Sequence, residues 1–482
     1  MSFPAALNEP CGRPDTLRPG ARLGPAIKGA DVRMIDRSRV AELMERERST
    51  FRRRHARSGQ LAEEAKGSLL FGVPMNWMTR WPGDHAVFVD RAEGAHFWDV
   101  DGNEFIDLCL GDTGGMAGHA PKIAVDAIAE QAGKGITLML PTEDATWVGA
   151  EMTRRFRVPY WQFTTTATDA NRFVIRWARE ITKRPKIVVH NWCYHGSVDE
   201  TIATLEDGRT VTREGNIGKP VDLDLTTRVV EINDLVGLEA ALAEGDVAAC
   251  LFEPALTNIG IVLPDSGYHE GVRELCTKYG TLLIIDETHT ISAGPGGCTK
   301  AWGLDPDFVT IGKTLGAGIA SGAYGMTERV SDMIYEHADW KNADVGGVGG
   351  TLAGNALSLA AMKATLGHVM TDEAFERMIA LGERFEQGVR GVIESRELPW
   401  HVVRLGCRVE YLFRSDVARD GAEAAAGQDD EVDPYIHLFL LNRGILMTPF
   451  HNMALMSPAT TADDVDRHTQ VYSEMADELI GR

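Results

Sequence analysis

The chain has 482 residues and a mass of 52.7 kDa, with 44% hydrophobic and 25% charged residues. A chain of this length and composition can bury a large hydrophobic core. It is therefore not a peptide, a stapled mini-protein or a largely disordered chain. The formal charge of -21 disfavours binding to nucleic acid and to anionic membrane surfaces.

The cysteines and the apolar runs bear on location. Seven cysteines are scattered without CxxC spacing, which favours free thiols in a reducing compartment over a disulfide framework or a zinc site. The first thirty residues hold no continuous apolar segment, and no apolar run approaches the roughly 18 residues of a membrane helix. We therefore expect a soluble cytoplasmic protein with no membrane partner, no nucleic-acid partner and no bound metal.

The N-terminal quarter divides into three patterns. Residues 1–35 are rich in Pro and Gly and are expected to form an extended arm. Residues 38–66 have helical periodicity, and residues 85–108 show short aromatic and β-branched runs separated by turn signals, which indicates a β-meander. We assign residues 36–115 to the N-terminal part of a small domain.

The centre of the chain alternates between strand-like and helical runs. The expected strands are short, apolar and β-branched, which is typical of a mostly parallel sheet covered on both faces. They are expected at 186–190, 247–253, 281–287 and 307–312, and the helices between and beside them near 169–183, 235–243 and 268–279. Residues 116–370 are therefore predicted to form a large α/β domain.

The last part of the chain is expected to return to the small domain. Apolar residues at helical spacing predict a helix over 372–394, and strands, a loop at 420–431 and a final helix follow. Residues 371–482 are thus the C-terminal part of a smaller α+β domain built from both chain ends.

Four consecutive strand ends offer reactive side chains. In open α/β sheets, ligands bind at the carboxyl ends of the strands. Tyr194 and His195 follow the strand at 186–190, and Glu253, Asp286 and Lys313 end or follow the next three. A lysine at the end of a buried strand is unusual, and desolvation there favours the nucleophilic amine that Schiff-base chemistry requires.

Other interpretations of Lys313 are weaker. By itself it could be a surface lysine whose stem packs along apolar residues. Gly312-Lys313-Thr314 resembles the end of a P-loop, but that motif needs Gly where Asp307 stands, so we discard it.

Two segments are suited to phosphate. Residues 163–171 place several threonines directly before a helix, where hydroxyl and backbone N–H groups can bind an anion or cap the helix. Residues 346–355 are a second glycine-rich approach to a helix. A Schiff-base lysine, an aspartate for a pyridinium nitrogen, an aromatic ring and a phosphate site together indicate pyridoxal phosphate.

The motifs resemble those of the class III (ω-type) aminotransferases, with glutamate-1-semialdehyde aminomutases as close relatives, over roughly residues 60–480. The matching segments are 166–171 (family S-G-T-E-A-N), 191–196 (G-x-Y-H-G), 253–258 (E-P-x-x-x-N), 286–288 (D-E-V), 310–313 (T-x-G-K) and 350–356 (G-T-x-x-x-N-P). This resemblance implies pyridoxal-phosphate fold type I and a homodimer with shared active sites.

The resemblance also implies a role for each matching residue. Lys313 is the Schiff-base lysine, Asp286 the partner of the pyridinium nitrogen, and Tyr194 the aromatic that stacks on the ring. Further cofactor contacts are expected from Thr166, Ala167, Thr168, His195, Glu253, Asn258, Thr288 and, from the neighbouring subunit, Thr351.

Several residues depart from the family pattern. Ala167 replaces a Gly near the phosphate, Thr288 replaces a Val that packs on the ring, and Ala356 replaces a Pro. The Gly-Phe-Arg stretch common after D-E-V is absent, and residues 289–292 (His-Thr-Ile-Ser) stand there. The lysine and the aspartate remain, so the cofactor is expected to bind, while the substrate class is left open.

Substrate residues are expected just before and after the meander. Arg80 is positioned to pair with a carboxylate, although it could equally be a surface residue. Trp77 could make the pocket apolar, and Asp112 and Thr113 match the family loop that lines it.

The leading hypothesis is an aminotransferase that moves an amino group between an amine or amino acid and a carbonyl acceptor through Lys313. The alternative on the same scaffold is a 1,2-aminomutase of the glutamate-1-semialdehyde type, or an amino-acid racemase. A non-catalytic cofactor-binding protein and a metal hydrolase are weaker possibilities, because Lys313 and Asp286 are retained and no HExxH spacing occurs.

Overall fold

The computed structural model describes residues 35–219, 221–337, 346–449 and 451–481, which belong to one compact unit. The arm expected at 1–35 lies outside the described residues except for its last position. Among the helices of this described part, none is long and apolar enough to cross a membrane.

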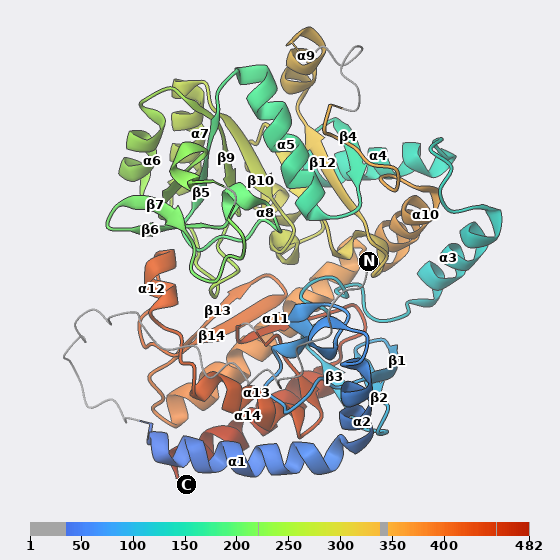
Figure 1. Ribbon diagram of the computed structural model, residues 1–482, viewed down its shortest axis with the longest axis vertical. Coiled ribbons are helices and arrows are strands. Elements are labelled where there is room, and N and C mark those ends of the chain that lie inside the picture. The colour runs from blue at the N-terminus through green and yellow to red at the C-terminus, as the bar shows by residue number, and fades with distance from the viewer. Residues whose placement is uncertain (1–34, 220, 338–345, 450, 482) are drawn as a thin grey trace, which may run out of the picture. The chain divides into compact units, whose positions relative to one another are not determined.

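A seven-stranded sheet forms the centre of the large α/β region (Figure 1). Its order is β4-β12-β11-β10-β9-β5-β8, and the pairs from β11 to β8 are parallel, whereas β12 is antiparallel to both neighbours. The strands are β4 (Tyr160–Thr164), β5 (Lys186–His190), β8 (Thr227–Val230), β9 (Val247–Phe252), β10 (Leu282–Asp286), β11 (Phe308–Ile311) and β12 (Gly322–Met326). The expectation of a mostly parallel sheet is confirmed.

Helices pack against this sheet because its central strands are apolar on both faces. Every residue of β9 and β10 is buried, and α5 packs against β9, β11 and β12. The helices of this region are α3 (Lys122–Lys134), α4 (Glu143–Phe156), α5 (Ala167–Thr182), α6 (Leu235–Leu242), α7 (Tyr268–Tyr279), α8 (Gly297–Ala301), α9 (Glu328–His337) and α10 (Ala356–Ala364), and a small hairpin joins β6 (Ala203–Glu206) to β7 (Arg209–Thr212).

Segments from both ends of the described chain form two smaller sheets. The first has the order β1-β2-β3-β15 and the second β13-β14-β16. Their strands are β1 (Val89–Glu93), β2 (His96–Asp99), β3 (Glu104–Asp107), β13 (His401–Leu405), β14 (Arg408–Leu412), β15 (Ile445–Leu446) and β16 (Met453–Leu455). The pairing of β3 with β15 joins the expected meander to the C-terminal part of the chain.

The helices beside these sheets are α1 (Arg37–Arg54), α2 (Ala56–Ala65), α11 (Asp372–Ser395), α12 (Gly421–Ala425), α13 (Val432–Leu441) and α14 (Ala462–Ile480). The pairs α1 with α13 and α11 with α14 pack together, as Figure 1 shows in its lower part. The predicted helix at 38–66 is in fact two helices. They meet at His55, whose buried ring bonds Asp99 through Nδ1 at 2.9 Å.

Two further differences have local causes. The sequence analysis did not predict β12, because its Gly-Ala-Tyr-Gly-Met sequence has weak strand propensity. The strand forms because it is buried and paired between β4 and β11. The loop expected at 420–431 contains α12, which begins where the side chain of Asp420 accepts a hydrogen bond from the backbone N–H of Glu423.

Candidate active site

The carboxyl ends of the central strands border one cavity of about 370 Å³. Asp286 is the last residue of β10, and Lys313 lies two residues beyond the end of β11. The cavity brings together nine residues that the sequence predicted for the site, namely Trp77, Thr166, Ala167, Thr168, Tyr194, His195, Asp286, Thr288 and Lys313. All of them except Trp77 lie at or just beyond the carboxyl ends of strands, where the fold class predicts a ligand site.

Asp286 is fixed by three donors. Its Oδ2 accepts hydrogen bonds from Asn171 Nδ2 and His195 Nδ1, each at 2.8 Å, and its Oδ1 accepts one from the backbone N–H of Thr288 at 3.0 Å. Asn171, on α5, is held in turn by the hydroxyl of Thr310 at 2.7 Å. The carboxylate is therefore oriented by groups from three separate elements.

The charge of this pair follows from its contacts. Burial by itself would raise the pKa of Asp286, but the hydrogen bond and charge of His195, together with the hydrogen bonds from Thr288 and Asn171, lower it. Burial would lower the pKa of His195, whereas Cys193 and Asp286 raise it well above its usual value. Asp286 is consequently an anion beside a protonated imidazole.

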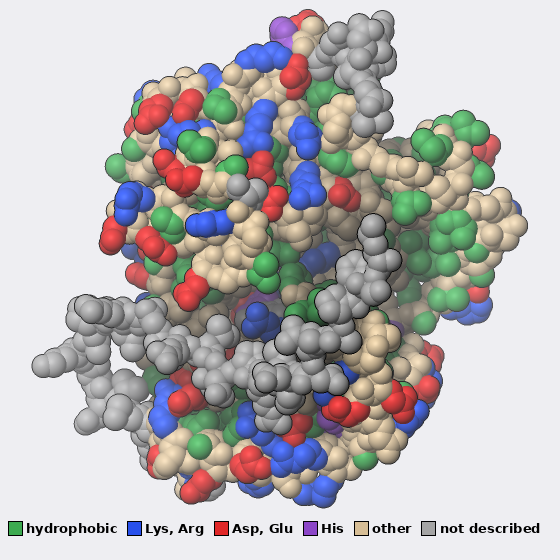
Figure 2. Space-filling view, in the orientation of Figure 1, with side chains coloured by type: hydrophobic (Ala, Val, Ile, Leu, Met, Phe, Trp, Pro, Cys, Tyr) green, Lys and Arg blue, Asp and Glu red, His purple; other side chains and the backbone are tan. Residues whose placement is uncertain are grey.

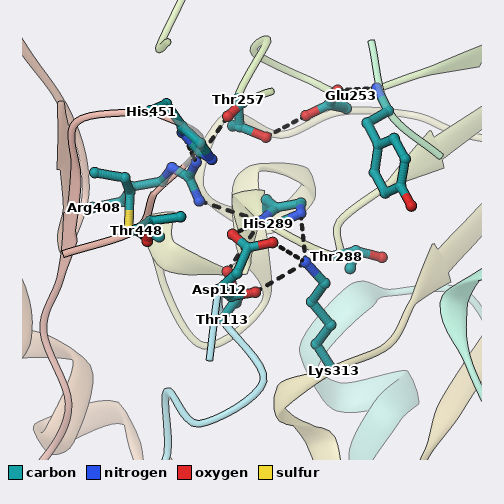
Figure 3. A network of polar contacts seen from close by, with 12 residues as sticks. Asp112, Thr113, Glu253, Thr257, Thr288, His289, Lys313, Arg408, Thr448 and His451 are labelled. Atoms are coloured by element: carbon teal, nitrogen blue, oxygen red, sulfur yellow. Dashed lines mark hydrogen bonds and ion pairs between the residues drawn. The ribbon is translucent and has the colours of Figure 1, made fainter. Parts of the chain in front are cut away.

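Three polar groups surround the amine of Lys313. Nζ donates to the carbonyl oxygen of Asp112 at 2.9 Å and to Asp112 Oδ2 at 2.8 Å, and it lies 2.9 Å from His289 Nε2. Figure 3 shows these contacts converging on the end of the lysine side chain. The backbone of Lys313 has a φ of 59°, an unusual value for a residue with a side chain and one that occurs at functional sites.

The N-terminus of α5 forms one wall of the cavity. Thr166 is its N-cap and accepts from the backbone N–H of Asp169, so the capping interpretation of this segment is correct for Thr166. The hydroxyls of Thr165 and Thr166 also contact Asp169 Oδ2. A Cβ at Gly312 would lie 2.7 Å from the backbone nitrogen of Ala167, so glycine lets β11 approach this helix end closely.

A second cavity of about 270 Å³ adjoins the first, with which it shares Trp77, Tyr194 and His289. Arg80, Asp112 and Asn258 line this second cavity, together with Arg213. Arg213 donates from Nη2 to the carbonyl of Cys193 at 2.7 Å. Its buried Nε has no hydrogen-bond partner among the described residues. The two arginines bring two guanidinium groups to this cavity.

Three sequence-predicted residues lie outside both cavities. Glu253 is buried behind Tyr194, where its Oε1 accepts from the backbone N–H of Tyr194 at 3.2 Å. Thr113 is buried and contacts His289 Nδ1 at 3.0 Å through its hydroxyl. Thr351 lines a separate cavity with Met139 and Leu140. The structure therefore does not bring Glu253, Thr113 or Thr351 to the wall beside Lys313.

The sequence analysis missed a buried polar network behind His289. Arg408 is fully buried on β14; its Nη2 donates to Glu410 Oε1 at 2.6 Å, and its Nη1 contacts His289 Nδ1 at 3.2 Å. His451 Nδ1 lies 2.8 Å from Glu410 Oε1. Figure 3 shows Arg408 between His451 and His289. A signal was present: Arg408 and Glu410 point to one face of an otherwise apolar strand, and charged residues are seldom buried unless they are paired or used.

The charges around His289 oppose its protonation. Burial lowers the pKa of His289 well below its usual value, and the positive charges of Lys313 and Arg408 lower it further, although Asp112 acts in the opposite direction. Burial would raise the pKa of Asp112, but Lys313, His289 and other cationic neighbours hold it well below its usual range. The network therefore contains an anionic Asp112 and a neutral His289.

Comparison with known proteins identifies the family of this chain. The sequence profile named "Aminotransferase class-III" matches residues 78–475. This chain belongs to that family. Membership confirms the family resemblance and implies pyridoxal phosphate as the cofactor.

Individual relatives agree. A glutamate-1-semialdehyde 2,1-aminomutase of Chloroflexus aggregans is 32% identical over 406 residues, which cover 82% of this chain and 91% of the relative. The crystal structure of a glutamate-1-semialdehyde aminomutase from Pseudomonas aeruginosa PAO1 matches with 49% identity and a TM-score of 0.91, covering 92% of this chain and 99% of that one. A lysine-to-alanine variant of that aminomutase, in complex with PMP, matches equally well. These matches confirm fold type I.

The residues of the first cavity fit the cofactor. An anionic aspartate suits a protonated ring nitrogen, a lysine amine suits an aldehyde, and a helix N-terminus suits a phosphate. The buried hydroxyl of Thr288 borders this cavity and has no hydrogen-bond partner among the described residues. A polar ring atom of the cofactor would satisfy it.

Proposed function

We propose that this protein is a pyridoxal-phosphate-dependent 1,2-aminomutase, which moves an amino group between adjacent carbons of one substrate. The observation that carries the proposal is the 49% identity over 92% of the chain to a solved glutamate-1-semialdehyde aminomutase, together with a cavity that holds Lys313 and Asp286. The sequence hypotheses ranked transamination first, and these comparisons favour the aminomutase alternative.

In this proposal the first cavity holds the cofactor, which when bound supplies an electron sink for the electrons released as a substrate carbon loses its proton. Lys313 Nζ is the covalent attachment point, and its free amine carries protons to and from the substrate. Asp286, held by Asn171, His195 and Thr288, supports the positive charge of the ring nitrogen.

The remaining walls position the cofactor. The start of α5, at Ala167 and Thr168, receives the phosphate at the helix N-terminus. Tyr194 borders both cavities. Its ring meets the ring of Trp77 edge-on, with the two ring centroids 5.8 Å apart. This aromatic pair separates the cofactor from bulk water and presents an apolar surface to the ring.

The second cavity is assigned to the substrate. An amino aldehyde that also carries a carboxylate, such as the compound named in the relatives' activity, needs a cationic partner. Arg80 and Arg213 border this cavity, and a guanidinium can pair with both oxygens of a carboxylate. The substrate would thus lie between the arginines and Lys313.

A homodimer is part of the proposal. Apolar side chains are exposed on α3 and the segment that follows it, namely Ile123, Val125, Ile136, Leu138, Met139 and Leu140. Green side chains gather over this part of the chain at the right of Figure 2. Thr351 lines a cavity with Met139 and Leu140 rather than the cavity of Lys313, which agrees with a role in the neighbouring subunit's site. Sedimentation of wild type and Leu140→Glu tests this, with a dimer expected for wild type and a weakened dimer for the variant.

The decisive experiment for the reaction uses glutamate 1-semialdehyde as the only substrate. An aminomutase converts it to the isomer with the amino group on the neighbouring carbon without an added acceptor. Lys313→Ala is the inactive control. Conversion that begins only when a separate amino donor or keto acid is supplied would contradict the proposal and favour the family's other chemistry, transamination.

A further inference from the structure

A buried carboxylate holds His451 at the wall of the second cavity. His451 Nδ1 lies 2.8 Å from Glu410 Oε1, and both side chains are buried. Burial would raise the pKa of Glu410, but the charges of His451 and Arg408 and their hydrogen bonds lower it. Glu410 is thus an anion, which can only accept hydrogen bonds. Nδ1 of His451 therefore carries a hydrogen and donates it to Glu410.

Arg408 does not compete for this nitrogen. Its Nη2 lies 3.4 Å from His451 Nδ1, but this nitrogen has only two hydrogens to donate. Nη2 gives them to Glu410 Oε1 at 2.6 Å and to the carbonyl oxygen of Thr257 at 2.8 Å. The carboxylate therefore fixes the tautomer of His451, and the neutral ring has its lone pair on Nε2.

His451 borders the cavity assigned to the substrate, which Arg80, Arg213 and Asp112 also line. Since Nδ1 is taken by Glu410, Nε2 is the polar atom that the ring can offer to this cavity. The two guanidinium groups suit a carboxylate of the substrate. The anionic Asp112 and the lone pair of Nε2 suit a positively charged amino group in the same cavity.

We propose that His451 is a further acid–base residue of this site, which removes a proton from the amino group of the substrate. An ammonium group has no lone pair and cannot form a bond to carbon until it loses a proton. The N–H bond breaks and its electron pair stays on the substrate nitrogen, while the lone pair of Nε2 forms the new N–H bond. The positive charge moves to the imidazole ring, and the proton returns to the amino group of the product as it leaves. The inference rests on the proposed function in taking the second cavity as the substrate site.

The groups around His451 suit a ring that gains and loses a proton. Glu410 supports the imidazolium from Nδ1, in the arrangement by which a carboxylate orients a catalytic histidine. Its Oε2 is buried and has no hydrogen-bond partner among the described residues, so the anion gains from a positive charge on the ring. The guanidinium of Arg408 opposes that charge, and Asp112 and the neutral His289 are also near enough to interact with it.

The test compares two small molecules that each carry an amine and a carboxylate, 4-aminobutanoate and aminooxyacetate. The first is an ammonium ion at pH 7, whereas the oxyamine of the second is already unprotonated. Each is mixed with protein that carries pyridoxal phosphate, and the first phase of the near-visible absorbance change gives the rate.

The variants separate the base from its surroundings. His451→Asn keeps an amide nitrogen that can donate to Glu410 but removes Nε2, and His451→Ala removes the whole ring. His368→Asn is the matched control, because His368 is exposed at the protein surface. Circular dichroism establishes that each variant is folded.

Three results are expected. His451→Asn reacts with 4-aminobutanoate about 100-fold more slowly than wild type at pH 7, at the lower end of the range for loss of an acid–base group. The same variant reacts with aminooxyacetate at the wild-type rate, because that amine needs no base. Added imidazole accelerates the reaction of His451→Ala with 4-aminobutanoate in proportion to its concentration.

An equal slowing with both molecules would overturn the inference and leave His451 a structural role. So would a His451→Asn rate with 4-aminobutanoate equal to that of wild type. This readout needs no complete turnover, so it is separable from the proposed reaction. If the expected His451 dependence is found in a protein that converts no amino aldehyde, the inference stands and the proposed function falls.

Discussion

Two aspartate–histidine pairs of the site carry different charges. Asp286 bonds His195 Nδ1 at 2.8 Å, and the pKa of that histidine is raised well above its usual value. Asp112 Oδ1 lies 3.8 Å from His289 Nδ1, and the pKa of His289 is lowered well below its usual value. The same two residue types thus give an ion pair at Asp286 and an anion beside a neutral ring at Asp112.

The neighbours of each pair account for the difference. Cys193 and the direct hydrogen bond to Asp286 favour the protonated form of His195. His289 lies between Lys313 and Arg408, so a further positive charge is unfavourable there. In the proposed function the first pair supports the positive charge of the ring nitrogen, and the second lies beside the reacting amine of Lys313.

Replacement of Lys313 should have the largest effect on turnover. Lys313→Ala is expected to lower turnover at least about 10⁴-fold, because it deletes both the covalent attachment point and the proton carrier. Steady-state conversion of the amino aldehyde measures this. Lys363→Ala, at an exposed lysine paired with Asp144, is the control and should retain wild-type turnover. Residual activity near that of wild type in Lys313→Ala would remove the assignment.

Replacement of Asp286 is expected to cause the next largest loss of turnover. Asp286→Asn keeps a similar shape but removes the negative charge, so turnover should fall about 10²- to 10³-fold while the cofactor still binds. Absorbance titration measures cofactor binding and initial rates measure turnover. An unchanged rate would contradict a charge role for Asp286.

The cationic wall of the second cavity can be tested through Arg80. Arg80→Ala should raise KM for a carboxylate-bearing substrate about 10- to 100-fold and change kcat less, because one charged hydrogen-bonding group is lost. An amine substrate without a carboxylate is the matched comparison and should keep its KM. Equal KM values for wild type and variant with every carboxylate substrate would place the recognition elsewhere, with Arg213 the next residue to replace.

Asp112→Asn should have a smaller effect than Asp286→Asn. The backbone carbonyl of residue 112 remains as an acceptor for Lys313, His289 still contacts the amine, and an asparagine oxygen can still accept a hydrogen bond. We expect about a tenfold loss of turnover, within the range for one hydrogen bond to a charged group. Parallel initial-rate measurements on the two variants compare the pairs, and a greater loss at Asp112 would reverse their proposed order.

His468 is a buried histidine whose ring nitrogens have no hydrogen-bond partner among the described residues, and its replacement should have the smallest effect. Burial lowers the pKa of His468 to about 3. Below pH 6.5 the unfolded chain takes up a proton that the folded chain does not bind until about pH 3, so His468 costs stability as the pH falls. Between pH 7.5 and 5 this loss amounts to about 2 kcal/mol.

Urea unfolding at both pH values and one protein concentration measures this contribution. His468→Leu should lose about 2 kcal/mol less than wild type on going from pH 7.5 to 5. His368→Leu, at an exposed position, should lose as much as wild type. An identical pH dependence in wild type and His468→Leu would mean that His468 is hydrated or paired in solution.

The two sides of the cavity also differ in how far the sequence predicts them. Asp286 and Lys313 follow strands whose apolar, β-branched pattern is visible, and parallel strands bring their carboxyl ends to one edge. His289 was visible only as a departure after the D-E-V position. Its partners Asp112 and Arg408 are 177 and 119 residues away along the chain, counted from their numbers, and no local pattern pairs them.

The same distinction holds for the fold. The β9 and β10 strands are continuous apolar runs and were predicted, whereas β12 contains two glycines and forms through its neighbours. The break between α1 and α2 depends on a contact of His55 with Asp99, which only the folded chain makes. Tertiary contacts override local propensity at each of these positions.

The most direct test of the central claim is to locate the cofactor on the chain. The purified protein is incubated with pyridoxal phosphate, reduced with borohydride, digested and examined by peptide mass spectrometry. The account predicts one reduced cofactor per chain, attached to Lys313 and absent from Lys313→Ala. Attachment to another lysine, or no attachment at all, would contradict it.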